Sequence, residues 1–247
     1  MQQNKCMALA TEEKSGLQDG PAQESSPNGP ASSLLGRLIP RAFFEAPPEQ
    51  VAPRLLGKVL AHFTESGVIA GRIVETEAYL GPHNEPPDPA AHSCNGPTPR
   101  NCVLFGPAGF AYVYSIYGRY FCMNISCETE GRAGCVLLRA LEPLAGVEGM
   151  ALNRGLAQGA VPRMLTSGPS RLCQALGLTR QLHNSLDLVD SKSPLQLRDD
   201  GFQVTEVVVT PRIGVHVAAD WPLRFALPGH SCVSGPKNLI GKRIYLR

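Results

Sequence analysis

From Leu38 onward, short apolar runs separated by polar, glycine-containing turns predict a series of β-strands. The strands are expected over residues 58–63, 68–77, 111–116, 120–126, 135–141, 202–210, 213–217 and 223–227. Helix start and stop signals predict short helices over residues 47–57, 147–156 and 167–177. Because most strands follow one another with few helices between them, one mixed domain with antiparallel pairing is favoured over a wound parallel sheet.

The two ends of the chain differ in character. Residues 1–36 are rich in Ser, Gly, Gln, Pro and Ala and carry few bulky apolar side chains, so we expect a disordered tail. Residues 37–247 are expected to form a single folded domain. Within it, residues 80–109 form a long loop rich in Pro, Gly and Asn, and a loop of that length inside a compact domain is usually functional.

Charge and cysteine content narrow the class of protein. The whole chain carries a net charge of +2, and residues 1–34 hold two lysines and four acidic residues. The remainder therefore has 21 basic and 17 acidic residues, a net charge of +4 that permits a polyanionic partner. None of the eight cysteines forms a Cys-x-x-Cys pair, so reduced thiols in an intracellular protein are expected. No apolar run is long enough to predict a membrane span, and no secretion signal is visible.

Five of the six tyrosines lie in one stretch of the chain, between residues 79 and 120. The pair Glu75-Thr-Glu77 precedes this stretch, and Asn124 and Arg139 follow it. Aromatic faces, an amide, a guanidinium and a carboxylate are the groups that a pocket needs to hold a flat heteroaromatic base and break a bond to it. The sequence therefore favours a base-binding pocket in this part of the domain.

Several motifs in this region are similar to those of one known family. They are Glu77-Ala-Tyr-Leu-Gly-Pro82, Ala90-Ala-His-Ser93, Thr98-Pro-Arg-Asn101, Tyr112-Val-Tyr-Ser-Ile-Tyr-Gly118 and Phe121-Cys-Met-Asn-Ile125. Over residues 36–235 the chain closely resembles the alkyladenine (3-methyladenine, or N-methylpurine) DNA glycosylase family, and in particular its vertebrate-type members. The resemblance implies an α+β domain with a curved, largely antiparallel sheet flanked by helices, and no helix-hairpin-helix motif.

The two glutamates are the candidates for catalysis. They are two residues apart on an expected strand, so their side chains share one face of the sheet. One carboxylate could act as a base while the other is salt-bridged, or both could simply be solvated. The resemblance implies that Glu77 deprotonates a water aimed at the sugar C1′, with Arg139 orienting that water. It also matches Ile213 with a position whose backbone carbonyl contacts the water.

The resemblance also implies how a damaged base would be held. Tyr79 and Tyr114 match two aromatic walls that sandwich the flipped base, and His92 matches a residue beside the sugar and base edge. Tyr117 matches a wedge that fills the gap left in the duplex. Asn124 matches a residue on the pocket floor that rejects the 2-amino group of guanine. Tyrosines on adjacent strands often serve only cross-strand packing, and we assign that role to the remaining two, Tyr112 and Tyr120.

Contacts to the DNA backbone are less strongly indicated. Arg100 is the preferred candidate, whereas the helix start at residues 167–170 suits either a phosphate or simple N-capping. Two departures from the family pattern bear on affinity and lesion preference. The loop over residues 81–92 is longer than usual by about four residues, which could shift His92, and residues 94–97 lack an expected basic residue.

The prediction is a monomeric, cofactor-free, metal-free and monofunctional glycosylase that acts on double-stranded DNA without contacting membranes. Its expected substrates are alkylated or deaminated purines of the 3-methyladenine, 7-methylguanine, hypoxanthine and ethenoadenine class. A nuclear location is expected, with mitochondria as a second location. Two alternatives stay open: a non-catalytic binder of damaged DNA that uses the same pocket, and a nucleoside hydrolase, which usually needs an acidic metal cluster that the sequence lacks.

Overall fold

The computed structural model describes residues 35–235 and 241–246, so all but the last two residues of the tail predicted for residues 1–36 lie outside the described residues. Leu35 is only 7% exposed and packs in a small apolar cluster with Val59, Ala61 and Ala70. The next residue, Gly36, has a φ of +80°, and a Cβ at this position would meet the backbone of Asp199. The described domain therefore begins with a closely packed segment, so the expectation of disorder is wrong for residues 35 and 36.

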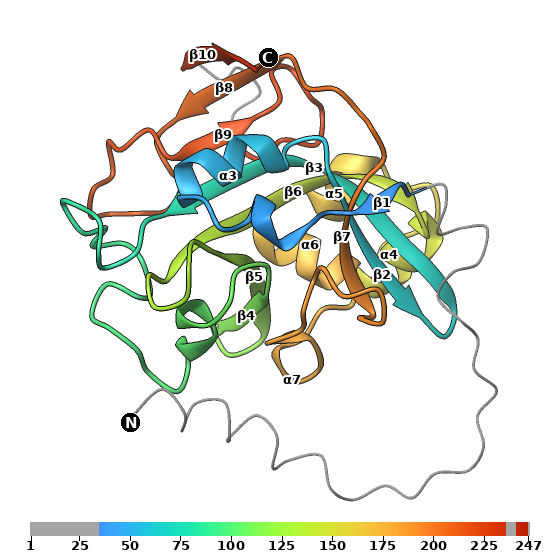
Figure 1. Cartoon of the computed structure of the whole chain (residues 1–247). Helices are drawn as coiled ribbons and strands as arrows, with labels where there is room; N and C mark the ends of the chain where they lie inside the picture. The colour runs from blue at the N-terminus through green and yellow to red at the C-terminus, as the bar shows by residue number, and fades with distance from the viewer. Residues whose placement is uncertain (1–34, 236–240, 247) are drawn as a thin grey trace, which may run out of the picture.

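Within the described residues, one ten-stranded sheet organises the domain, and all its strand pairings are antiparallel. The strands are β1 (Arg37–Leu38), β2 (Val59–Thr64), β3 (Gly67–Tyr79), β4 (Ala111–Ile116), β5 (Tyr120–Cys127), β6 (Gly134–Ala145), β7 (Leu195–Asp199), β8 (Glu206–Thr210), β9 (Arg224–Ala226) and β10 (Lys242–Tyr245). The main path runs β1-β7-β2-β3-β6-β5-β4. A branch leaves β3 through β9 to β8 and β10, at the top of Figure 1.

Short helices cover this sheet. They are α3 (Pro48–Leu55), α4 (Val147–Asn153), α5 (Pro162–Thr166), α6 (Pro169–Ala175) and α7 (Arg180–His183), with 3-10 turns η2 (Arg41–Phe43) and η3 (Cys102–Phe105). In Figure 1, α3 crosses in front of the sheet while α5 and α6 lie behind it. The Thr76 hydroxyl on β3 donates to the carbonyl of Ala52 in α3 at 3.0 Å. Helices on both sides explain why β3 is buried along most of its length.

The centre of the sheet is irregular where β3 meets β6. The register places Glu75 opposite Ala140 but Thr76 opposite Leu138, which leaves Arg139 without a partner on β3. A second shift lies between Ile73 and Glu75. Bulges of this kind occur beside active sites because they re-aim side chains. Here the bulge directs Arg139 toward the two glutamates of β3.

The α+β class and the antiparallel sheet are confirmed, and the strands expected at 111–116 and 120–126 end within one residue of β4 and β5. The strand expected at 213–217 is wrong: this segment is irregular, and Gly214 has a φ of +75°. The strand expected from residue 202 begins only at Glu206. The sequence did not predict strands β1, β7 and β10 or helices α5 and α7.

Two expectations drawn from composition concern membrane-spanning helices and the cysteine side chains. Within residues 35–235 and 241–246, no helix combines the length and apolar character needed to cross a bilayer. Six cysteines in the same ranges, Cys94, Cys122, Cys127, Cys135, Cys173 and Cys232, carry free thiols, and all of these except Cys94 are buried. The prediction that most of the thiols are buried is confirmed for these six.

Candidate active site

The two glutamates of β3 lie on one face, as expected, but they have different surroundings. Glu75 is fully buried and accepts four hydrogen bonds. Its Oε1 receives Nε of Arg139 at 2.9 Å, Nε of Arg224 at 2.7 Å and the hydroxyl of Ser234 at 2.9 Å, and its Oε2 receives the Ser234 amide at 2.7 Å. Glu75 is therefore the salt-bridged member of the pair.

Glu77 is held more loosely by three neighbours. Its Oε1 accepts the backbone N–H of Ile213 at 2.8 Å and lies 3.1 Å from Nη1 of Arg139. Its Oε2 accepts the hydroxyl of Tyr79 at 2.9 Å. Burial, followed by the negative charge of Glu77, raises the pKa of Tyr79, so this phenol stays a hydrogen-bond donor. The carboxylate is thereby left as an acceptor with lone pairs to spare.

Arg139 joins the two carboxylates and is only 6% exposed. Burial lowers its pKa, but the charges of Glu77 and Glu75 outweigh that effect and the net shift is upward. With Arg224, the cluster contains two carboxylates and two guanidinium groups, so its formal charge is balanced. The sequence prediction placed Arg139 beside a water; in the free protein its role is to hold both glutamates.

A cavity of about 340 Å³ opens beside this cluster. It is lined by Tyr79, Ala90, His92, Tyr112, Tyr114, Asn124 and Cys135, and by residues 214–217. Volumes of this order suit small-molecule and base-sized ligands. Glu77 stands behind the Tyr79 hydroxyl at the wall of this cavity. The structure thus brings together the predicted carboxylate and all four predicted base-binding residues.

His92 is fixed by aromatic neighbours on β4. Its Nδ1 lies 3.1 Å from the hydroxyl of Tyr112, and its ring meets that of Tyr114 edge-on at a centroid distance of 4.6 Å. Burial and then the charge of Arg100 lower the pKa of His92, which favours the neutral ring. Tyr112 is fully buried, as its packing role requires, but its hydroxyl also positions His92, a function that the sequence did not indicate.

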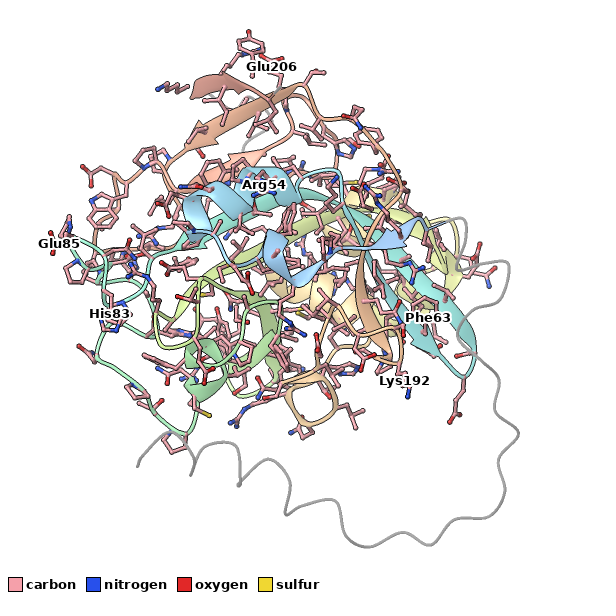
Figure 2. All side chains as sticks on the ribbon, in the orientation of Figure 1. Arg54, Phe63, His83, Glu85, Lys192 and Glu206 are labelled. Atoms are coloured by element: carbon pink, nitrogen blue, oxygen red, sulfur yellow. The ribbon has the colours of Figure 1, made fainter. Side chains whose placement is uncertain are left out.

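The longer loop over residues 81–92 does not displace His92 from the pocket. Its additional residues extend outward, and Figure 2 shows His83 and Glu85 at the edge of the molecule. The loop returns at Asp88, a fully buried residue that accepts the backbone amides of Leu80 and Ala90. This anchor separates the outward extension from the segment that carries His92.

Asp88 also forms a buried ion pair with Arg212. The two guanidinium Nη atoms contact the carboxylate at 2.5 and 3.0 Å, and both side chains are fully buried. The guanidinium carbon lies 4.6 Å from the centroid of the Tyr79 ring, and Nη1 donates to the Ala78 carbonyl. Ile213 follows Arg212 directly in the chain. The Asp88–Arg212 ion pair therefore supports both the Tyr79 ring and the Ile213 amide that contacts Glu77.

The predicted wedge lies at the tip of the β4–β5 hairpin. Tyr117 is 91% exposed and has a φ of +49°, which is unusual and strained for a bulky residue. Arg100 reaches the same hairpin, because its Nη2 donates to the Ser115 carbonyl at 3.3 Å and its guanidinium lies over the Tyr114 ring. Arg100 is exposed and near Tyr117, although its contact with DNA stays a prediction.

The helix start at residues 167–170 begins α6, but its N-cap is Gly168, with no side-chain cap bond. Simple N-capping by a serine is therefore wrong. Sequence reasoning also missed four residues of the site, Asp88, Arg212, Arg224 and Ser234. A signal existed for Arg224, since a charge inside the apolar run 223–227 requires a buried partner.

Comparison with known proteins identifies the family to which the chain belongs. Residues 42–231 match the family described as Methylpurine-DNA glycosylase (MPG). A Koribacter versatilis protein named "Putative 3-methyladenine DNA glycosylase" is 53% identical over 211 residues, covering 85% of this chain and 100% of the relative. Proteins with the same name are 46% identical in Nitrobacter winogradskyi, covering 87% of this chain and 95% of the relative, and 48% identical in Methanoculleus marisnigri, covering 79% and 98%.

The family match and the names of these relatives show that the chain is a DNA glycosylase, an enzyme of DNA repair. The chain belongs to the methylpurine-DNA glycosylase family. The relatives named here are bacterial and archaeal, so the vertebrate-type assignment stays a prediction.

Proposed function

We propose that this protein excises alkylated and deaminated purines from double-stranded DNA by hydrolysis of the N-glycosylic bond. The substrates would be of the 3-methyladenine, 7-methylguanine, hypoxanthine and ethenoadenine class. The observation that carries the proposal is the position of Glu77, whose carboxylate accepts the Tyr79 hydroxyl at the wall of an aromatic cavity. A carboxylate beside a base-sized pocket is suited to chemistry at the sugar attached to that base.

The chemical step would use Glu77 as a general base. It takes a proton from a water directed at C1′, while its negative charge stabilises the oxocarbenium character that develops on the sugar. The carboxylate is kept in position by Arg139 and by the Ile213 amide. No lysine lines the cavity in the described part of the chain, which favours direct hydrolysis over a Schiff-base intermediate.

Recognition would follow from the cavity walls. The Tyr79 and Tyr114 rings would stack on the everted base, a contact worth about 1–3 kcal/mol per base. Cation–π attraction adds to this when the alkylated purine is positively charged. Asn124 on the cavity lining is placed to discriminate against the 2-amino group of guanine.

The damaged base would have to be extruded from the duplex before it could enter the cavity. Extrusion costs a few kcal/mol, and the cost is smallest for a weakened base pair. Tyr117 is the proposed wedge. Its 91% exposure and its left-handed backbone at the hairpin tip are costly features that insertion into DNA would explain. Arg100, beneath the same hairpin, is the proposed backbone contact. The proposal includes a monomer in the nucleus, with mitochondria as a second location.

The test is single-turnover release of hypoxanthine from a duplex oligonucleotide, read as alkali-labile sites, with Glu77→Gln compared with the natural chain. The natural chain should cleave, and Glu77→Gln should be slower by about 10²–10⁴-fold. Glu65→Gln, at an exposed turn position, is the matched control and should be unchanged.

Two outcomes would overturn the proposal. One is near-normal excision by Glu77→Gln, which removes the general base from the mechanism. The other is tight binding of the natural chain to each lesion duplex without any abasic product, which would instead support a non-catalytic binder of damaged DNA. Cleavage of free inosine that Tyr117→Ala leaves unaffected would favour a nucleoside hydrolase.

A further inference from the structure

The lining of the cavity contains a thiol next to the residue proposed for selectivity. Cys135 on β6 pairs with Tyr79 on β3 and with Ser126 on β5, so it lies between the strands that carry the cavity residues. Both Cys135 and Asn124 are 4% exposed, and both line the cavity. The Cys135 Sγ is 3.7 Å from Oδ1 of Asn124, with the thiol as donor.

This contact defines which end of the Asn124 amide faces the cavity. A carboxamide has one oxygen that accepts and one nitrogen that donates twice. The oxygen of Asn124 is directed to the thiol, and its Nδ2 donates to no group among residues 35–235 and 241–246. The nitrogen is therefore the end left to meet a bound base.

The thiol is suited to act as a permanent donor. Burial, with a further contribution from the charge of Asp88, raises the pKa of Cys135 to about 12. A thiolate could only accept a hydrogen bond and would favour the opposite orientation of the amide. Near neutral pH the protonated thiol keeps the amide in the observed orientation.

We propose that Cys135 is a specificity-positioning residue that acts through Asn124. It holds the amide with Nδ2 toward the base, so the 2-amino group of guanine meets a donor where it needs an acceptor. Hypoxanthine carries only a hydrogen at that position and is not penalised. Without the thiol, a half-turn of the amide presents Oδ1 to the amine, and discrimination falls. This inference rests on the proposed glycosylase function.

The test compares single-turnover excision of guanine and of hypoxanthine, each opposite thymine in the same duplex sequence. The measured quantity is the ratio of the two rates, which does not depend on the fraction of active protein. Cys135→Ala should raise the guanine-to-hypoxanthine ratio about tenfold, because an unpaired donor is replaced by a paired acceptor. Cys135→Ser keeps a donor and should retain the natural ratio.

A matched control separates specificity from packing. Cys173→Ala removes another fully buried thiol, on α6, and should leave the ratio unchanged. An unchanged ratio in Cys135→Ala, or a raised ratio in both Cys135→Ala and Cys135→Ser, overturns the inference. If the natural chain does not excise hypoxanthine at all, the proposed function itself fails, and the two failures are thereby distinguished.

Discussion

Replacing Glu75 with glutamine should destabilise the fold much more than the same change at Glu77. All four groups that contact Glu75 are donors. An amide whose oxygen takes the place of Oε1 can still accept from Arg139, Arg224 and the Ser234 hydroxyl. Its NH₂ group must then face the Ser234 amide, which leaves two donors opposed inside the protein.

The magnitude follows from burial and charge. Arg139 and Arg224 are 6% and 3% exposed, and Glu75→Gln removes the carboxylate that both of them contact. Removal of one partner from a buried ion pair costs about 3–5 kcal/mol. In Glu77→Gln the amide oxygen can still accept hydrogen bonds from Arg139 and from the Ile213 N–H. The Tyr79 hydroxyl can turn to accept from the new NH₂ group. We expect this change to cost about 1–2 kcal/mol.

The assay is urea unfolding of both variants and the natural chain at neutral pH, combined with hypoxanthine excision at low temperature. Glu75→Gln should lose stability but retain excision within about tenfold while folded, whereas Glu77→Gln should lose about 10²–10⁴-fold in rate. If Glu75→Gln costs no more stability than Glu77→Gln, the assignment of a structural role to one carboxylate and a chemical role to the other is refuted.

Two further predictions concern pH and backbone strain. Burial lowers the pKa of His62, His92 and His183 below 6.5, the ordinary value for histidine. The contribution of these three neutral rings to the free energy of unfolding is therefore complete above pH 6.5. It is lost as the pH falls through their lowered pKa values in the folded state. The urea midpoint should therefore fall as the pH is lowered below 6.5. Replacing both His62 and His183 by glutamine should make the midpoint depend less steeply on pH, and an unchanged dependence would contradict this prediction. Tyr117→Gly should relieve the positive φ and raise the free energy of unfolding by about 1 kcal/mol, while slowing excision from duplex DNA. A variant that is no more stable, or fully active, argues against a strained wedge.

Much of the fold could be predicted because its signals are local. Strands β4 and β5 lie where short apolar runs placed them, and α3 is followed by Gly57, whose φ is +83°. The segment 213–217 shows the limit of local patterns. Its apolar residues resemble a strand, but Gly214 adopts a left-handed conformation and the segment lines the cavity instead.

The residues of the site also fall into those that the sequence could predict and those that it could not. Residues that share motifs, such as Glu77, Tyr79 and His92, could be named in advance because each has a recognisable neighbourhood in the sequence. The partners that hold them could not. Arg224 reaches Glu75 across 149 positions, and Arg212 reaches Asp88 across 124. Pairing over such distances is decided by the register of the sheet and by burial, which a single sequence does not reveal.

The unequal bonding of the two glutamates gives a physical reason for their different roles. A carboxylate that accepts from four donors, two of them cationic, has no acceptor site left for a reacting water. Glu77 lacks that saturation, and one of its oxygens meets only the Tyr79 hydroxyl, a group that can also accept. Glu75 fixes Arg139, and Arg139 in turn fixes Glu77. The buried ion pair is thus a rigid support for the carboxylate that remains free to react.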